Sequence, residues 1–190
     1  MLPSYCVRIW CDYTVKYGLA YLLHNGVCGA CFNDYSRMVL SADGSFVQYW
    51  DSPKCQKMQV VYMEDLQSSN LKKKLLLMQH FCAYLKQRVN QSQEEIVCRR
   101  GDPATCEALG HVKYWARTKD GMLFRMANKD TQANFSDHTK VVIESNTRTV
   151  FYSTSQGVQE INFADLADRE KYHEVRKRIA LIKVMSKELI

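Results

Sequence analysis

Proline and glycine are scarce in this sequence, with three prolines and eight glycines among 190 residues. This scarcity excludes collagen-like, linker-like and low-complexity chains. Long apolar runs are also missing, because charged residues interrupt every stretch well before the ~20 residues that a membrane-spanning helix needs. With 46% hydrophobic and 24% charged residues, the composition is typical of a soluble globular protein of one generous domain or two small ones.

Catalytic signatures are missing as well. The sequence has no Gly-rich phosphate loop after a strand, no kinase signature, and no histidine in a nucleophile elbow or a metal-binding helix motif. We therefore expect no catalytic activity and no cofactor. The formal net charge of +6 suits an acidic or phosphorylated partner. Nucleic acid is not expected, because neither an aromatic ladder nor a recognition helix is apparent.

Eight cysteines are present, and the first residues lack the basic stretch and apolar core of a signal peptide. We therefore expect reduced thiols and an intracellular protein. Cys28 and Cys31 have the spacing of a zinc or redox motif, but a zinc site needs two more ligands and no second such pair exists. The favoured interpretation is two cysteines of a strand without metal, and the alternative is a metal or redox site.

The sequence predicts the same order of elements twice, several strands followed by a helix. Short strands over residues 4–63 precede a helix over 70–91, and strands over 110–161 precede a helix over 163–190. At a constant offset of 103 residues, the segment from Phe32 to Leu40 matches the segment from Phe135 to Ile143, and Gly18 matches Gly121. Several matches at one offset indicate an internal repeat.

Each repeat predicts an antiparallel meander and a covering helix. Asp-Tyr-Ser and Asp-His-Thr form tight turns, and turn spacing gives about six strands in each half. The helices carry apolar residues three or four apart, with Ser69 as the expected N-cap of the first. Since each sheet needs one face covered, we predict an α+β fold of two sheets, each packed against one helix, joined by a linker without periodicity.

His138 and Lys140 are the most informative polar pair. They lie two residues apart at an expected strand start, so their side chains should point the same way. Two neighbouring cationic or donor groups are favourable if an anion binds between them. The alternative is a solvated turn, and the Lys72–Lys74 run likewise fits a solvated helix face.

Trp10 lies in an early expected strand. A tryptophan there is usually part of the core. A tryptophan at an interface would instead provide a platform for a bound peptide. Both interpretations stay open at this point.

Three segments together resemble the polo-box family. Trp10-Cys-Asp-Tyr-Thr-Val-Lys-Tyr-Gly and the stretch from Val27 to Leu40 are similar to a first polo box, and the segment from Leu71 to Leu85 is similar to its closing helix. Asn134-Phe-Ser-Asp-His-Thr-Lys resembles the signature of a second polo box. The resemblance covers almost the whole chain in order.

The resemblance implies two tandem polo boxes, each a six-stranded antiparallel sheet packed against one helix, at 1–91 and 110–190 with a linker at 92–109. It implies a non-catalytic module that docks phosphoserine or phosphothreonine peptides and targets a polo-like Ser/Thr kinase to primed substrates and cell-division structures. The implied phosphate-binding residues are His138 and Lys140. The implied peptide-binding residues are Trp10, Cys11, Val89 and Asn90, and an aromatic pocket is implied at Tyr13, Tyr17, His80, Phe81 and Tyr84.

The sequence departs from the family at Val89-Asn90, where an apolar pair is usual, at Cys11, where a β-branched residue is usual, and at His80, which replaces an aromatic residue. Two alternatives therefore stay open: phosphate-independent interaction or dimerisation, and regulation of the kinase domain in cis. The expected partners are phosphorylated proteins, with the parent's own kinase domain and a second copy as further candidates and no membrane partner. The implied locations are the cytoplasm, cytoskeletal, centrosome or basal-body structures, and the nucleus.

Overall fold

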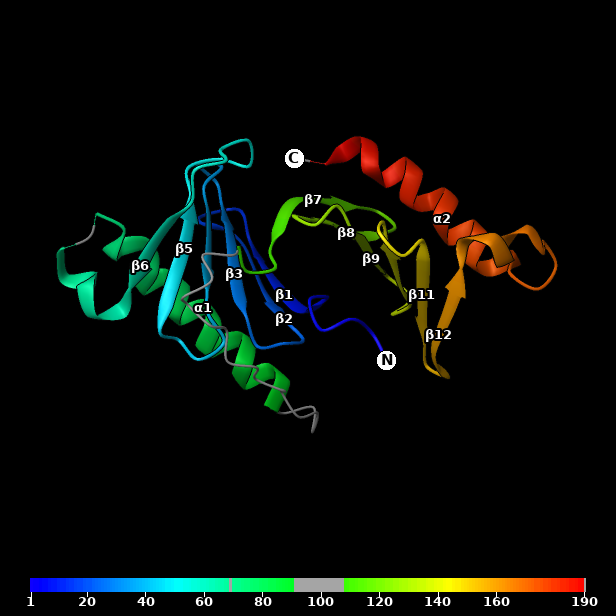
Figure 1. Cartoon of the computed structure of the whole chain (residues 1–190), viewed down its shortest axis with the longest axis horizontal. Helices are drawn as coiled ribbons and strands as arrows, with labels where there is room; N and C mark the ends of the chain where they lie inside the picture. The colour runs from blue at the N-terminus through cyan, green and yellow to red at the C-terminus, as the bar shows by residue number, and fades with distance from the viewer. Residues whose placement is uncertain (69, 91–107, 190) are drawn as a thin grey trace. The chain divides into compact units, whose positions relative to one another are not determined.

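The computed structural model describes residues 1–68, 70–90 and 108–189. It divides into two compact units (Figure 1). The first unit is Val7–His111, and the second unit combines Met1–Cys6 with Val112–Ile190. Within the described ranges, no helix has the length and apolar character needed to cross a membrane.

The first unit is a six-stranded antiparallel meander in which every strand pairs with its neighbour in sequence. A 3-10 helix, η1 (Met63–Ser68), and one long helix, α1 (Lys72–Asn90), follow the sheet. The expected N-cap Ser69 lies outside the described residues. The strands are β1 (Val7–Tyr13), β2 (Gly18–Leu23), β3 (Cys28–Phe32), β4 (Arg37–Leu40), β5 (Phe46–Trp50) and β6 (Gln59–Tyr62).

The second unit repeats this topology, which confirms the predicted pair of six-stranded sheets. Its helical part differs from the prediction of one helix over 163–190. The structure has a 3-10 helix η3 (Phe163–Ala167), then α2 (His173–Met185) and a short η4 (Ser186–Glu188), because Asp168 is extended and ends the first turn. The strands are β7 (Val112–Thr118), β8 (Gly121–Met126), β9 (Thr131–Phe135), β10 (Lys140–Glu144), β11 (Thr149–Thr154) and β12 (Gly157–Asn162).

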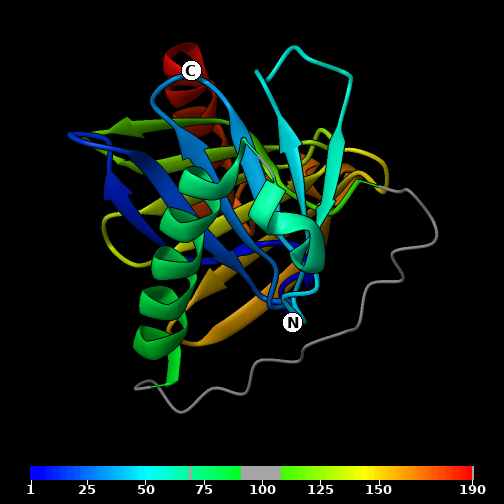
Figure 2. The same cartoon turned by 90° about the vertical axis from the view of Figure 1, so that its left-hand side faces the viewer.

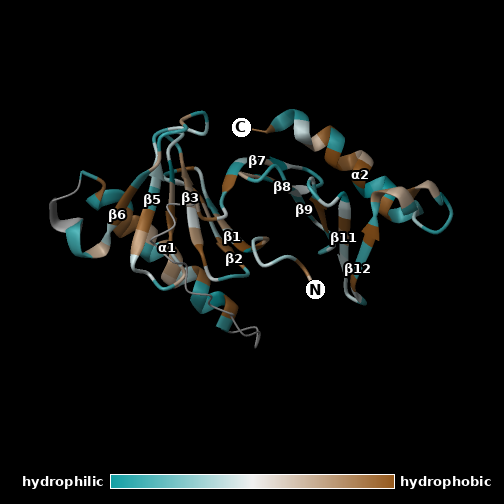
Figure 3. Ribbon diagram, in the orientation of Figure 1, coloured by the Kyte–Doolittle hydropathy of each residue, from teal (hydrophilic) through white to brown (hydrophobic). Residues whose placement is uncertain are grey.

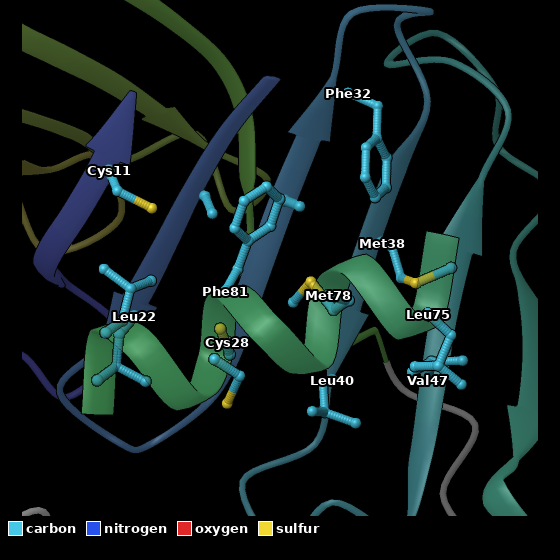
Figure 4. Close-up of a cluster of buried hydrophobic side chains, with 14 of the residues drawn as sticks. Cys11, Leu22, Cys28, Phe32, Met38, Leu40, Val47, Leu75, Met78 and Phe81 are labelled. Carbon is cyan, nitrogen blue, oxygen red and sulfur yellow. The ribbon is translucent and has the colours of Figure 1, made fainter. Parts of the chain in front are cut away.

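Each helix covers one face of its own sheet. Helix α1 contacts β1 to β4, and Figure 2 shows it lying across the strands of the first unit. Apolar residues alternate with polar ones along both helices (Figure 3), as expected for amphipathic helices. The stripe on α1 packs against the alternate residues of the sheet that point toward it (Figure 4). Its buried members are Leu75, Met78, Phe81, Cys82, Leu85 and Val89.

The two units share a close backbone approach at equivalent glycines. Gly18 and Gly121 have φ values of +145° and +144°, and a Cβ at either position would lie 2.1 Å from a carbonyl oxygen of the neighbouring strand. Gly18 pairs with Phe32, and Gly121 pairs with Phe135. Only glycine fits this conformation and this space. The repeat detected in the sequence is therefore a repeat of backbone geometry.

The first six residues, which the prediction assigned to the first polo box, pack with the second unit. Cys6 lies in a small core with Val142 and Phe151, and Tyr5 packs against the same group. The Tyr5 hydroxyl also donates a hydrogen bond to Glu144. Burial of these side chains explains why the chain begins in the second unit and enters the first at Val7. Most of the predicted linker, 92–109, lies outside the described residues.

Candidate functional site

His138 lies in the turn between β9 and β10. Asp137 shapes this turn, because its Oδ1 accepts hydrogen bonds from the backbone N–H of Thr139 at 3.0 Å and from the Thr139 hydroxyl at 2.7 Å. The N–H of His138 donates to the Phe135 carbonyl at 3.0 Å. His138 has φ of 68° and an exposed side chain, so its backbone helps to form the turn while its ring takes no part in the sheet.

Lys140 is the first residue of β10, where it pairs with Asn134 and Ser153 and is half-buried. His138 therefore lies outside the strand, and strand alternation does not set the direction of its side chain as expected. The left-handed turn at His138 does this instead. The structure thus places His138 in the turn, directly after Asp137, and Lys140 at the start of the strand that follows.

That carboxylate, Asp137, already has partners. Its hydrogen bonds from Thr139, together with the Arg178 guanidinium of α2, lower its pKa, and they outweigh the opposing effect of burial. Arg178 donates directly to Asp137 Oδ2. The negative charge of Asp137 is therefore compensated from the helix side, which keeps the turn favourable for a further anion.

Trp10 and Cys11 are neighbours on β1, an edge strand of the first sheet. Successive side chains of a strand point to opposite faces. Cys11 points into the core beneath α1, where burial raises the pKa of its thiol to about 11. Trp10 is half-buried on the opposite face and pairs with Tyr21. The side chain of Cys11 is thus part of the core, and Trp10 is the member of the pair on the face away from α1.

Val89 and Asn90 end helix α1. Val89 is 3% exposed and packs into the core, whereas Asn90 is exposed. Of the two residues that replace the usual apolar pair, Asn90 alone presents its side chain to solvent.

Four of the five predicted aromatic-pocket residues form one cluster. Tyr13 stacks on Phe81 with ring centroids 5.3 Å apart. Tyr84 makes an edge contact with Tyr13 at 6.4 Å, and Tyr17 makes an edge contact with Phe81 at 6.2 Å. His80 makes none of these ring contacts. It lines an adjoining cavity of about 520 Å³ together with Tyr17, Leu77 and three lysines, Lys16, Lys73 and Lys74.

Cys28 and Cys31 do not converge. Both lie on β3, three residues apart, so their side chains point to opposite faces of the sheet. Cys28 faces α1 within the core, and Cys31 is buried elsewhere. Across the part of the chain that the structure describes, no group of three or more potential metal-ligating side chains comes together.

Trp115 is the structural counterpart of Trp10 and was missed in the sequence. Trp10 pairs with Tyr21 on β2, and Trp115 pairs with Phe124 on β8. The turn between β1 and β2 spans residues 14–17, but the turn between β7 and β8 spans only 119–120. The offset between repeats is therefore two residues larger before this turn than after it, and a search at one offset passes over Trp115.

Known proteins share both the repeat and the fold. The family model described as "POLO box duplicated region" matches residues 15–75 and 118–179. The probable serine/threonine-protein kinase CCRP1 of Zea mays is 32% identical over 158 residues, which cover 82% of this chain and 25% of that protein. Serine/threonine-protein kinase plk-2 of Caenorhabditis elegans is 29% identical over 191 residues, covering 100% of this chain and 30% of that protein.

Solved structures agree. The polo-box domain of Cdc5 from budding yeast has a TM-score of 0.74 at 20% identity, covering 96% of this chain and 76% of that one. The same domain in complex with an Spc72 phosphopeptide gives a TM-score of 0.72 at 21% identity, covering 96% of this chain and 69% of that one. The chain spans 25% to 30% of the length of the two kinases above. Because the family model matches one segment in each unit and more than half of the chain, this protein belongs to the polo-box family, with one polo box in each unit.

Proposed function

We propose that this chain is a non-catalytic module that docks phosphoserine- or phosphothreonine-containing peptides and targets a polo-like Ser/Thr kinase to primed substrates. The observation that carries this proposal is the turn at His138 and Lys140, where an exposed imidazole and an ammonium group accompany a carboxylate that Thr139 and Arg178 already compensate. The two relatives compared above are serine/threonine-protein kinases that are longer than this chain. The kinase domain of a parent protein would therefore lie outside this chain.

The chemistry of this turn suits a phosphoryl group. A phosphorylated side chain carries about −1.5 to −2 charges and three acceptor oxygens. The Lys140 ammonium provides a full positive charge, and the His138 ring provides an N–H donor. Each charge-assisted hydrogen bond contributes roughly 1.5–3 kcal/mol. We therefore assign phosphate binding to His138 and Lys140.

We assign the peptide flanking the phosphate to the first polo box. Trp10 offers an apolar surface, and the edge strand β1 can add a peptide strand through backbone hydrogen bonds. Asn90 would contact the peptide by its side chain, whereas Cys11 and Val89 would contribute mainly through their backbone because their side chains are buried. The Cdc5 polo-box domain, which has the same fold, has been solved in complex with a phosphopeptide of Spc72 and with the Dbf4 polo-interacting region.

A second function is favoured by a separate observation. Tyr13, Tyr17 and Tyr84 are all at least 36% exposed; Tyr13 and Tyr17 contact Phe81, and Tyr84 contacts Tyr13. Such an exposed aromatic group is typical of a protein-binding surface. It can bind a partner, a second copy or the parent kinase domain without phosphate. For either function we propose an intracellular location, at cytoskeletal, centrosome or basal-body structures or in the nucleus.

The experiment is a fluorescence polarisation titration with a phosphopeptide selected from a library, beside its unphosphorylated form. The variant His138→Ala with Lys140→Met should lose at least about 100-fold in affinity, since two charge-assisted bonds are removed. The matched control is Tyr35→Ala, which changes the equivalent exposed turn residue of the first polo box and should leave affinity unchanged. Equal binding of both peptide forms, or an unchanged affinity in the double variant, would contradict phosphate docking.

A further inference from the structure

Two cysteines from distant parts of the first unit meet beneath helix α1. Cys28 comes from β3 and Cys82 from the middle of α1, and both belong to the core between the helix and the sheet (Figure 4 labels Cys28). They are 0% and 6% exposed. Both cysteines are free, and the two thiol groups form a hydrogen bond with each other.

The two thiols are electrostatically different. The hydrogen bond with Cys28, opposed by burial and assisted by the nearby Lys86 ammonium, lowers the pKa of Cys82 to about 7. The same hydrogen bond, together with burial, raises the pKa of Cys28. Cys82 is therefore the more acidic thiol of the pair.

The other buried cysteines of the described residues behave differently. Burial raises the pKa of Cys6 to about 12 and the pKa of Cys31 to about 11. A thiol with a pKa raised in this way stays protonated at neutral pH and is inert. Cys55 is partly exposed and donates to the Lys57 carbonyl oxygen.

We propose that Cys28 and Cys82 are an oxidation site, at which a hydroperoxide converts the hydrogen-bonded thiol pair into a disulfide that links β3 to α1. A thiolate with a neighbouring thiol is the arrangement that reacts in this way. Because β3 and α1 place both cysteines in the same buried core cluster, the disulfide would join two elements that already pack together.

The reaction balances with hydrogen peroxide as the oxidant. The Cys82 thiolate attacks one peroxide oxygen, the O–O bond breaks, and the departing hydroxide takes up a proton to become water. This step leaves a sulfenic acid on Cys82. Cys28 then attacks the Cys82 sulfur, its proton and the sulfenic hydroxyl leave as a second water, and the S–S bond forms. Two thiols are oxidised by two electrons in total, and the peroxide is reduced to two waters.

The disulfide would act on α1 as a whole. This helix carries Phe81 and Tyr84 of the aromatic cluster and ends at Asn90. A bond from its centre to β3 closes a long loop of chain and restricts the unfolded state. Oxidation is therefore expected to raise the unfolding temperature of the protein.

The test treats the reduced 190-residue chain with hydrogen peroxide, alkylates the remaining thiols in denaturant and maps the peptides by mass spectrometry. We expect a peptide pair joined through Cys28 and Cys82, lighter by two hydrogen atoms and released by dithiothreitol. Cys55→Ser is the matched control and should form the same bond, whereas Cys82→Ser should not.

A rate measurement keeps the test decisive if Cys82→Ser does not fold. Lys86→Met keeps both sulfurs but removes the cation near Cys82, and it should slow disulfide formation by about 10-fold through a higher thiol pKa. The proposal is overturned if Cys28 and Cys82 remain fully alkylated while Cys55 is oxidised, or if Lys86→Met reacts at the unchanged rate.

Discussion

The two polo boxes build the same turn and use it differently. In the first, Asp34 Oδ1 accepts hydrogen bonds from the backbone N–H of Ser36 at 3.0 Å and from its hydroxyl at 2.6 Å. Asp137 does the same with Thr139 in the second. The residue after each Asp is left-handed, with φ of 67° at Tyr35 and 68° at His138. The helix of each unit supplies a cation to its Asp, which is Lys74 in the first box and Arg178 in the second.

The difference lies in the basic residue at the start of the strand that follows each turn, Arg37 in the first box and Lys140 in the second. Arg37 is 3% exposed, and its guanidinium donates to the carbonyl oxygens of Tyr35 and Ser36. Its counterpart Lys140 is half-buried, next to an exposed His138. The first box therefore buries its basic residue, whereas the second has a less buried lysine two residues after an exposed histidine. In both boxes the turn is held by Asp and the hydroxyl residue, and the residues at the neighbouring positions differ.

The largest expected effect tests the shared part of the comparison. Gly18→Ala and Gly121→Ala should each destabilise the protein by about 3 kcal/mol, because the added Cβ meets a strand carbonyl in a left-handed conformation. Urea unfolding followed by circular dichroism measures the loss. Gly44→Ala is the control: Gly44 has φ of +74° with open space around it, and the cost should be nearer 1 kcal/mol. If Gly121→Ala lowers the free energy of unfolding no more than Gly44→Ala does, the close approach of the glycine to the neighbouring strand does not limit which residue fits there.

An intermediate effect tests the difference between the boxes. Lys140→Met should weaken phosphopeptide binding by about 10- to 100-fold, which corresponds to one charge-assisted bond. Arg37→Met should leave affinity unchanged and lower stability instead, because the Tyr35 and Ser36 carbonyls lose a donor. Calorimetric titration and urea unfolding of both variants separate the two results. If Arg37→Met weakens binding as much as Lys140→Met, the boxes are functionally alike.

The smallest effect concerns the two aspartates. Burial raises the pKa of Asp34, but hydrogen bonds from Lys74 and Ser36 outweigh it, so its pKa is lowered overall, as is that of Asp137. A lowered folded-state pKa gives stability that is present above the ordinary carboxyl value and is lost as pH falls through the folded-state value. Both side chains are about half exposed, so we expect only about 0.5 kcal/mol from each.

Unfolding measured from pH 7 down to pH 2 tests this last prediction. Asp34→Asn and Asp137→Asn should each remove a similar, small part of the pH dependence. Unequal losses would show that Lys74, which also bonds the Ser36 and Tyr49 hydroxyls, makes the first turn the stronger one.

Much of the fold could be predicted because its determinants are local. Asp-Tyr-Ser and Asp-His-Thr specify their turns by hydrogen bonds over two residues, and the apolar spacing on α1 follows from helix geometry. The long helix expected over 163–190 was wrong in extent, because Asn162 caps a separate 3-10 turn before α2 begins at His173.

The candidate site was less accessible from sequence. The resemblance implies Cys11 and Val89 as peptide-binding residues but does not indicate that their side chains lie in the core beneath α1, because this depends on how the strand and the helix face each other. The cations Lys74 and Arg178 could not be assigned to Asp34 and Asp137, since about 40 residues separate each pair and only packing brings them together. The association of Met1–Cys6 with the second unit is equally nonlocal.

That association has a consequence for the order in which the protein is made. The first box is one uninterrupted stretch, Val7–His111, and all of its strands and its helix leave the ribosome before the strands of the other box. The second box is split, with Tyr5 and Cys6 synthesised first and the strands that bury them more than a hundred residues later. Its first segment must therefore remain unpacked throughout the synthesis of its neighbour, so the burial of Tyr5 and Cys6 is completed only when the second sheet forms.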